Sequence, residues 1–308
     1  MRYLSINREM VPAEKQTAVD VGRLLPIAAL LSAALLWGSS FSAMRVSVQA
    51  MSPWSVMWLR MVIALAVILP FSIRMKTNDY RKGDWRMLLP MVLLQPCLYF
   101  LLEAYALKFT TSSQAGVISA SVPLMVAVGA WLMLAEPLGR RTFAGLFLSV
   151  AGVAVLSLSG RASASAANPL LGNGLELCAM ISAAMNIIFV KRLCARYNPW
   201  LLTILQLAAG TLFFSPGLVL LFRQSPTMWT VPLIFSVLLL AVVSVGAFGL
   251  YNWAMSRVPA SRASAFINLV PVAAVAFGWM VLGEALSSVQ CVAAVSVIVG
   301  VAISQKGA

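Results

Sequence analysis

Residues 24–47 read LLPIAALLSAALLWGSSFSAMRVS and carry a single charged side chain, Arg45, near their end. An α-helix rises about 1.5 Å per residue, so roughly 20 apolar residues cross the hydrocarbon core of a bilayer. This stretch is therefore long enough to span a membrane. The residues before it contain several charges and no apolar run, which argues against a cleaved signal peptide. We expect a permanent transmembrane helix here.

The rest of the chain continues this pattern. Hydrophobic residues make up 61% of the 308 positions and charged residues 10%, against about 45–50% and about 25% in soluble domains. A water-soluble fold cannot bury that much apolar surface. The apolar runs predict an all-α, polytopic membrane protein with ten transmembrane helices and no separate soluble domain. The expected helices cover residues 24–47, 55–74, 85–107, 114–135, 143–160, 172–194, 200–222, 230–255, 262–282 and 288–304.

The basic residues indicate how the chain is oriented. A net charge of +13 would suit a nucleic-acid partner if the basic side chains shared one surface, but they cluster between the apolar runs. The clusters fall on alternate connections, and the remaining connections hold only Lys108, Arg161 and Arg223. The positive-inside rule then places both termini in the cytoplasm. We expect a multi-pass protein of a bacterial inner membrane, with a lipid bilayer and a small molecule as its partners.

The residue types argue against an enzyme. The chain has no histidine, which removes the commonest general base and metal ligand. We find no nucleophile with a base, no metal-ligand cluster and no phosphate-binding loop, and we expect no metal and no cofactor. The four cysteines lie in or beside apolar segments without a Cys-x-x-Cys pair, so we interpret them as packing residues.

The chain contains an internal repeat. Because each half holds five helices, the second half would enter the membrane in the opposite sense, which gives an inverted 5+5 repeat of residues 24–160 and 172–304. Inverted repeats are typical of secondary carriers, with the substrate site between the halves near the midplane. A shift of 148 positions aligns Pro123 with Pro271, Glu136 with Glu284 and Gly152 with Gly300, and a shift of 146 aligns Arg45 with Lys191.

Four short motifs occur in order along the chain: Leu36-Trp37-Gly38-Ser39-Ser40-Phe41, Tyr105-Ala106-Leu107, Glu136-Pro137-Leu138 and Gly283-Glu284-Ala285-Leu286. With these motifs the chain resembles the EamA-like branch of the drug/metabolite transporter superfamily. The resemblance implies a ten-helix carrier with both termini cytoplasmic, a cavity lined mainly by helices 1–4 and 6–9, and peripheral helices 5 and 10. It implies amino acids, other metabolites or drugs as substrates, and fold alone does not choose among them.

Glu103 is interpreted as the only acidic residue well inside an apolar run. An intramembrane carboxylate is costly and is a functional candidate by default. It could couple transport to protons or bind a cationic substrate. The alternative is a structural ion pair with Arg60, which should lie at a similar depth, or with Arg45 or Lys108.

Further polar and aromatic side chains could line the cavity. Gln95, Tyr99 and Glu103 are spaced by four and should share one helical face. The other candidates are Trp37, Ser40, Asn186 and Asn268. Hydrogen bonds between helices would explain most of these residues equally well.

Pro123 and Pro271 fall in the middle of expected helices and are candidate hinges, with fixed helix shape as the alternative. Glu136 and Glu284 end helices near the surface, where a carboxylate could cap the helix that follows. An architectural role is favoured for this pair.

We therefore predict a secondary transporter of small molecules, with export as the preferred direction. It would work by alternating access and could be proton-coupled. A passive facilitator or channel for neutral solutes is the alternative. The substrate, the direction of transport and the oligomeric state stay open at this point.

Overall fold

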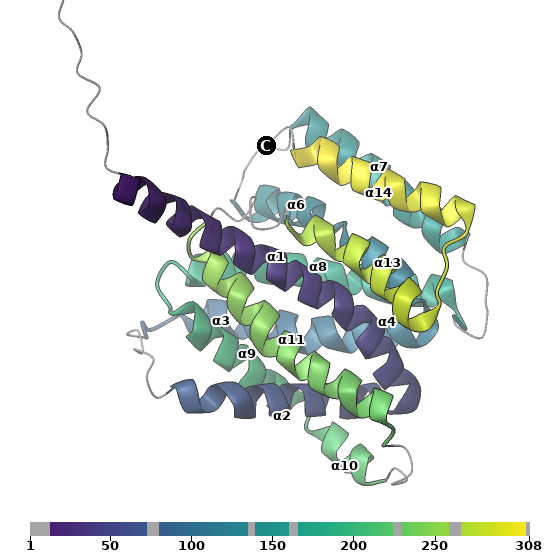
Figure 1. Ribbon diagram of the computed structural model, residues 1–308, viewed down its shortest axis with the longest axis horizontal. Coiled ribbons are helices and arrows are strands. Elements are labelled where there is room, and N and C mark those ends of the chain that lie inside the picture. Colours follow the sequence, from purple (N-terminus) through teal and green to yellow (C-terminus); the bar gives the residue numbers. More distant parts are fainter. Residues whose placement is uncertain are drawn as a thin grey trace, which may run out of the picture.

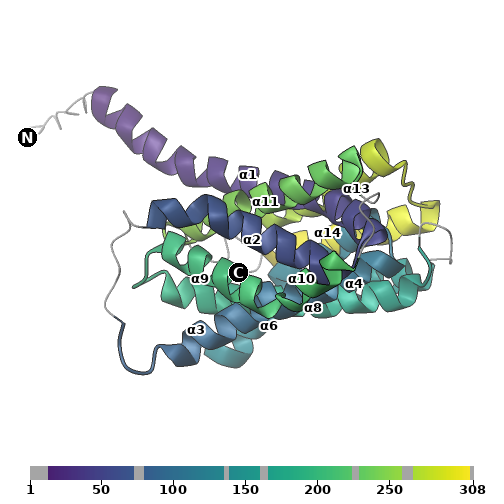
Figure 2. The ribbon, with the colours of Figure 1, turned by 90° about the horizontal axis from the view of Figure 1, so that it is seen from below.

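The computed structural model describes residues 13–72, 80–134, 139–159, 166–223, 229–258 and 266–305. The described chain forms one helical bundle (Figure 1), from which the start of α1 projects (Figure 2). Its helices are α1 (Ala13–Ala50), α2 (Pro53–Ser72), α3 (Trp85–Val92), η1 (Leu93–Leu98), α4 (Tyr99–Phe109), α5 (Ser112–Ser119), α6 (Val122–Leu134), α7 (Arg140–Leu158), α8 (Pro169–Leu193), α9 (Pro199–Phe213), α10 (Pro216–Phe222), α11 (Val231–Met255), η3 (Phe266–Asn268), α13 (Leu269–Leu282) and α14 (Ser288–Gln305).

The helices have the length and composition of a multi-pass membrane protein. In the described ranges, six helical segments are long and apolar enough to cross a bilayer. The bent pair α9 and α10 would make a seventh span. Three shorter apolar helices lie at Phe143–Leu158, Leu269–Leu282 and Ser288–Gly300.

Several helices that the sequence predicted as continuous are interrupted. The expected helix 85–107 breaks at Gln95, and helix 200–222 bends by 54° between α9 and α10. The expected helices 114–135 and 262–282 are each divided into two segments as well. Proline accounts for these breaks, because it lacks an amide donor and its ring clashes with the preceding turn. Pro123 and Pro271 consequently lie in the first turn of α6 and of α13 rather than in mid-helix.

The packing of the helices follows the internal repeat. In the first half, α1 packs against α11 and α13 of the second half. The equivalent helix of the second half, α8, packs against α4 and against α5 and α6. Two further contacts join equivalent helices, namely α2 with α9 and α7 with α14, and α5 packs against α13. Each half therefore buries its helices largely against the other half.

Small residues bring α7 and α14 into close backbone contact at one side of the bundle (Figure 1). A methyl group added to Gly152 would lie 2.9 Å from the carbonyl oxygen of Ala293. One added to Gly300 would lie 2.7 Å from the carbonyl oxygen of Gly145. Lipid tails are as apolar as leucine, so helices in a membrane associate through such close packing.

We predict that Gly152→Ala destabilises the protein by about 1–3 kcal/mol, because the added methyl group would overlap rigid backbone atoms of α14. Thermal unfolding in detergent measures the effect. Gly174→Ala is the control, since nothing lies within 4 Å of the added methyl group there. Equal melting temperatures for the two variants would contradict the assigned packing.

Asp84 joins two connections at one end of the bundle, just before α3. Its carboxylate accepts hydrogen bonds from the Tyr197 hydroxyl at 2.6 Å, from Arg196 Nη2 at 2.8 Å and from the Arg81 amide at 3.0 Å. The Tyr197 hydrogen bond contributes most to lowering the pKa of Asp84 from 3.8 to about 2. The folded protein therefore favours the ionised form of Asp84.

A carboxyl group with a lowered pKa stabilises the fold above its unfolded pKa and loses that effect as the pH falls through the folded pKa. Asp84→Asn should therefore lower the melting temperature at pH 7. The difference from the wild type should narrow as the pH falls from about 4 towards 2. Thermal unfolding of both proteins across this range is the measurement, and a difference independent of pH would contradict the charge-based explanation.

Candidate functional site

A central cavity lies between the two halves. Its wall contains residues of α1, η1, α4, α5 and α6 from the first half, and of α8, α11, η3 and α13 from the second. Five residues proposed from the sequence lie on this wall, namely Trp37, Ser40, Gln95, Tyr99 and Asn186. The side chain of Asn268, also proposed, lies outside the described part of the structure.

The cavity is small in this state. Its volume is about 60 Å³, whereas sites for drug-sized ligands occupy roughly 300–1,000 Å³. A larger hollow of about 210 Å³ lies between α6, α7 and α8, but its wall is almost entirely apolar and belongs to one side of the bundle. Of these two cavities, the central one is formed by both halves and contains the residues proposed from the sequence.

The wall of the cavity is mainly aromatic and apolar. Trp37 contacts Tyr251 and Phe248 with ring centroids 5.0 and 5.8 Å apart. The Tyr251 hydroxyl is buried and has no hydrogen-bond partner among the described residues. Such a wall suits a largely apolar molecule that presents a few polar groups.

The break at Gln95 adds backbone polarity beside the cavity. Gln95 has extended angles (φ −147°, ψ 119°) within an otherwise helical segment. Broken helices at membrane depth persist where neighbouring groups satisfy the backbone. Side chains of the second half do so here: Asn186 donates to the Met91 carbonyl at 2.7 Å, Ser182 to the Leu94 carbonyl at 2.8 Å and Gln206 to the Gln95 carbonyl at 3.1 Å.

Glu103 lies behind the cavity wall and contacts Arg60. The Tyr99 hydroxyl donates a hydrogen bond to Glu103 at 2.5 Å, and Arg60 Nη1 lies 4.0 Å from the Glu103 carboxylate. Arg60 is 1% exposed. Its Nε donates to the Ser244 hydroxyl at 2.5 Å, and its guanidinium lies 4.0 Å from the Phe100 ring centroid. The structure therefore brings Tyr99, Glu103 and Arg60 together.

The structure contains a second intramembrane acid that was not predicted from the sequence. Glu176 of α8 is fully buried, so the interpretation of Glu103 as the only acidic residue well inside an apolar run is wrong. Glu176 lies in the second turn of α8. Its place inside the apolar run expected at residues 172–194 was the available signal.

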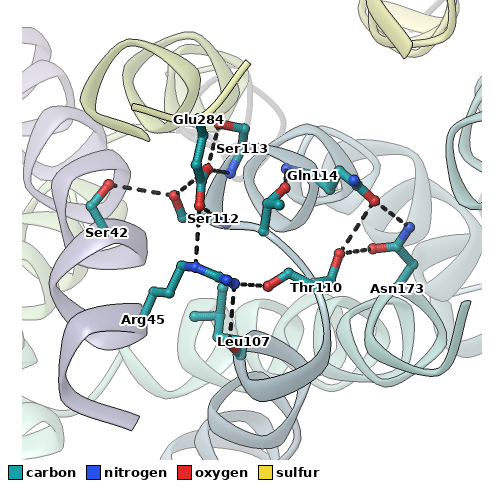
Figure 3. A network of polar contacts seen from close by, with 10 residues as sticks. Ser42, Arg45, Leu107, Thr110, Ser112, Ser113, Gln114, Asn173 and Glu284 are labelled. Carbon is teal, nitrogen blue, oxygen red and sulfur yellow. Dashed lines mark hydrogen bonds and ion pairs between the residues drawn. The ribbon is translucent and has the colours of Figure 1, made fainter. Parts of the chain in front are cut away.

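A polar network joins the two halves at one end of the bundle (Figure 3). Glu284, after α13, accepts hydrogen bonds from the amide groups of Ser112 and Ser113 at 3.0 and 2.9 Å, and from their hydroxyls at 2.8 and 2.7 Å. Arg45 Nε lies 3.2 Å from the Glu284 carboxylate. Arg45 also donates to the carbonyl oxygens of Leu107 and Thr110. We call Arg45, Ser112, Ser113 and Glu284 the latch.

The latch corrects the expectation for Glu284. The sequence suggested a surface carboxylate that caps the next helix. Instead, the Glu284 side chain is 5% exposed and binds the amino end of α5, a helix of the other half. A helix amino terminus attracts negative charge because its amides are free and its dipole is positive there. Glu136, the equivalent residue, lies outside the described residues.

The opposite end of the bundle repeats part of this arrangement. Lys191 Nζ donates to the carbonyl oxygens of Met255 and Val258, each at 2.8 Å. These two residues are 148 positions after Leu107 and Thr110, the carbonyl partners of Arg45. Equivalent cations therefore bind equivalent carbonyl groups in the two halves.

Comparison with known proteins identifies the family. Residues 24–158 and 170–305 match the model of the EamA-like transporter family, once for each half. The chain belongs to this family. As an EamA-like protein it is a transporter of the membrane rather than an enzyme, and a small molecule and the lipid bilayer are its partners.

Relatives of this EamA-like chain are similar over almost their full length. It is 27% identical to the "Uncharacterized transporter YetK" of Bacillus subtilis over 98% of this chain and 94% of that protein. It is 28% identical to "Uncharacterized transporter YcxC" of the same organism, over 89% and 90%. A solved crystal structure at 18% identity shares the fold with a TM-score of 0.60, covering 89% of this chain and 94% of that one.

We predict that Arg60→Met destabilises the protein by about 3–5 kcal/mol, because removal of one partner leaves a buried charge uncompensated. The double variant Arg60→Met with Glu103→Leu should recover much of the lost stability, because two apolar side chains leave no buried charge without a partner. Thermal unfolding of both variants in detergent measures the coupling. Additive losses in the double variant would show that Arg60 and Glu103 act independently.

Proposed function

We propose that the chain is a ten-helix secondary transporter of the inner membrane, built as an inverted repeat with both termini in the cytoplasm. Its substrates are small metabolites, such as amino acids and related compounds, or drugs. It exports them by alternating access. The observation that carries this proposal is a cavity formed jointly by the two halves, with the latch at one end. A channel would need a continuous path, and the latch interrupts it.

The position of the latch defines the state of the carrier. With a cytoplasmic N-terminus, α1 ends at the outer surface, which makes Arg45 and Glu284 an outer gate. Cavity residues such as Val190 and Asn252 lie towards the other end of α8 and α11. We therefore assign this state as closed to the outside. Export requires the latch to open, with Pro123 and Pro271 at the helix breaks as the candidate hinges.

The gate can be tested without knowing the substrate. Ser40 lies on the cavity wall, so a cysteine there in a chain without the four native cysteines reports access to the cavity. Glu284→Gln weakens the latch, because an amide carries no charge to pair with Arg45. We expect Ser40→Cys to react several-fold faster with an impermeant maleimide from outside when combined with Glu284→Gln. Unchanged reaction rates would contradict the gate.

Proton coupling is the second part of the proposal, with Glu103 and Arg60 as its candidate residues. Glu103→Gln keeps the shape of the side chain and removes its charge. It should abolish accumulation driven by a pH gradient in proteoliposomes while counterflow continues, with melting temperature as the control. Unchanged gradient-driven flux would contradict a role in coupling, and unfolding of the variant would favour a structural ion pair.

Accumulation against a gradient also separates the two transport mechanisms. A carrier coupled to protons concentrates its substrate, whereas a passive facilitator only equilibrates it. The experiment uses a panel of radiolabelled amino acids and lipophilic drugs in proteoliposomes, with and without a pH gradient. Equilibration alone would favour the facilitator.

A further inference from the structure

Glu176 is a buried acid without a partner. It is 0% exposed, and neither carboxyl oxygen has a hydrogen-bond partner in the part of the chain that the structure describes. A buried ionised carboxylate that is neither paired nor hydrogen-bonded is very costly, and the group avoids that cost by holding a proton. The neutral acid is therefore the form that this environment accepts.

Glu176 lies near Glu103, Tyr99 and Arg60, and we call these four residues the cluster. Along the interface of α8 with the kinked helix, Asn173 contacts Thr110 at one end and Ser182 contacts Leu94 at the other. Glu176 lies between these two contacts, as Glu103 does on the opposing helix. These contacts place Glu176 and Glu103 in the same stretch of the interface between α8 and α4.

The other charged groups on the surrounding helices lie farther away. The helices packed against α8 are α3, η1, α4, α5, α6 and α7. Their described titratable groups that face Glu176 are Tyr99 and Glu103, and Arg60 of α2 pairs with Glu103. The remaining charged residues on these elements stand at helix ends, namely Arg86, Lys108, Arg140 and Arg141.

The charges of the cluster require one proton. It contains one cation, Arg60, and two acids, Glu103 and Glu176. With both acids ionised the cluster is negative, and with both protonated it is positive, so a single proton makes it neutral. Like-charged carboxyl groups in one site cannot both ionise without a large penalty.

The contacts decide which acid holds that proton. Glu103 accepts a hydrogen bond from Tyr99 and lies beside Arg60, two contacts that stabilise an anion. Glu176 accepts no hydrogen bond and forms no ion pair with any described residue. We propose that Glu176 is the proton-binding site of this transporter, and that Glu103 is the fixed anion beside it.

This site lies next to the transport path, and it rests on the proposed proton coupling. Met180, one turn from Glu176, and Tyr99, which contacts Glu103, both lie on the cavity wall. When the cavity widens, water reaches Glu176 and the O–H bond can break, with the proton passing to water and the electron pair staying on the carboxylate. When the cavity closes, the dry environment favours the neutral acid again.

Infrared spectroscopy of the purified protein tests the site without any substrate. A protonated carboxylic acid has a carbonyl stretching band distinct from that of a carboxylate, and the band shifts in D₂O. We expect the wild type at pH 7 to show this band and Glu176→Gln to lack it. Glu284→Gln is the matched control, because the same change on an ion-paired carboxylate should leave the band in place.

Two outcomes would overturn the assignment. Persistence of the band in Glu176→Gln would place the proton on another group. Absence of the band from the wild type would mean that both acids are ionised, and a sodium-dependent melting temperature would then indicate a bound cation instead.

Transport assays distinguish a failure of the proton site from a failure of the proposed function. In proteoliposomes, Glu176→Gln should lose accumulation driven by a pH gradient and keep counterflow, at a melting temperature close to that of the wild type. If the wild type itself fails to accumulate any compound of the panel but Glu176→Gln removes the infrared band, the coupling is wrong and the proton site stands. If the wild type accumulates substrate and Glu176→Gln does so equally, the proton site is wrong and the transporter stands.

Discussion

The ion pair of Arg45 and Glu284 is the contact on which the closed end of the bundle depends. It joins α1 of the first half to the end of α13 in the second, and the same carboxylate holds the start of α5. A bilayer offers no water to replace such partners, so each polar group inside it needs one from the protein. The exchange of partners between the halves is what holds the two repeats together.

The same requirement explains where the helices break. At Gln95 the carbonyl groups released from the kinked helix are taken up by Asn186, Ser182 and Gln206 of the second half. At Glu103 the buried carboxylate is matched by Tyr99 and Arg60. Irregular backbone and intramembrane charge therefore occur where the two halves meet, and that is also where the cavity lies.

Much of the architecture could be predicted from the sequence, because hydrophobic length and internal repetition are strong signals. The membrane class followed from hydrophobic length, and the family followed from the resemblance of its motifs. The pairing of Glu103 with Arg60 was one of the alternatives that the sequence left open. The breaks at Gln95 and between α9 and α10 did not, because each depends on how neighbouring helices satisfy the backbone. Glu176 was not predicted, because its burial depends on how the neighbouring helices pack around the first turns of α8.

The latch at one end uses arginine, and lysine stands at the equivalent position of the other end. A guanidinium is a flat fork that donates several hydrogen bonds in fixed directions, whereas an ammonium is a strongly hydrated point charge. In the proposed alternating cycle, two ends built from different cations would differ in free energy when closed, and the two orientations would have unequal resting populations. Because a substrate would meet the resting orientation first, this difference between the repeats would bias which side of the membrane the protein samples.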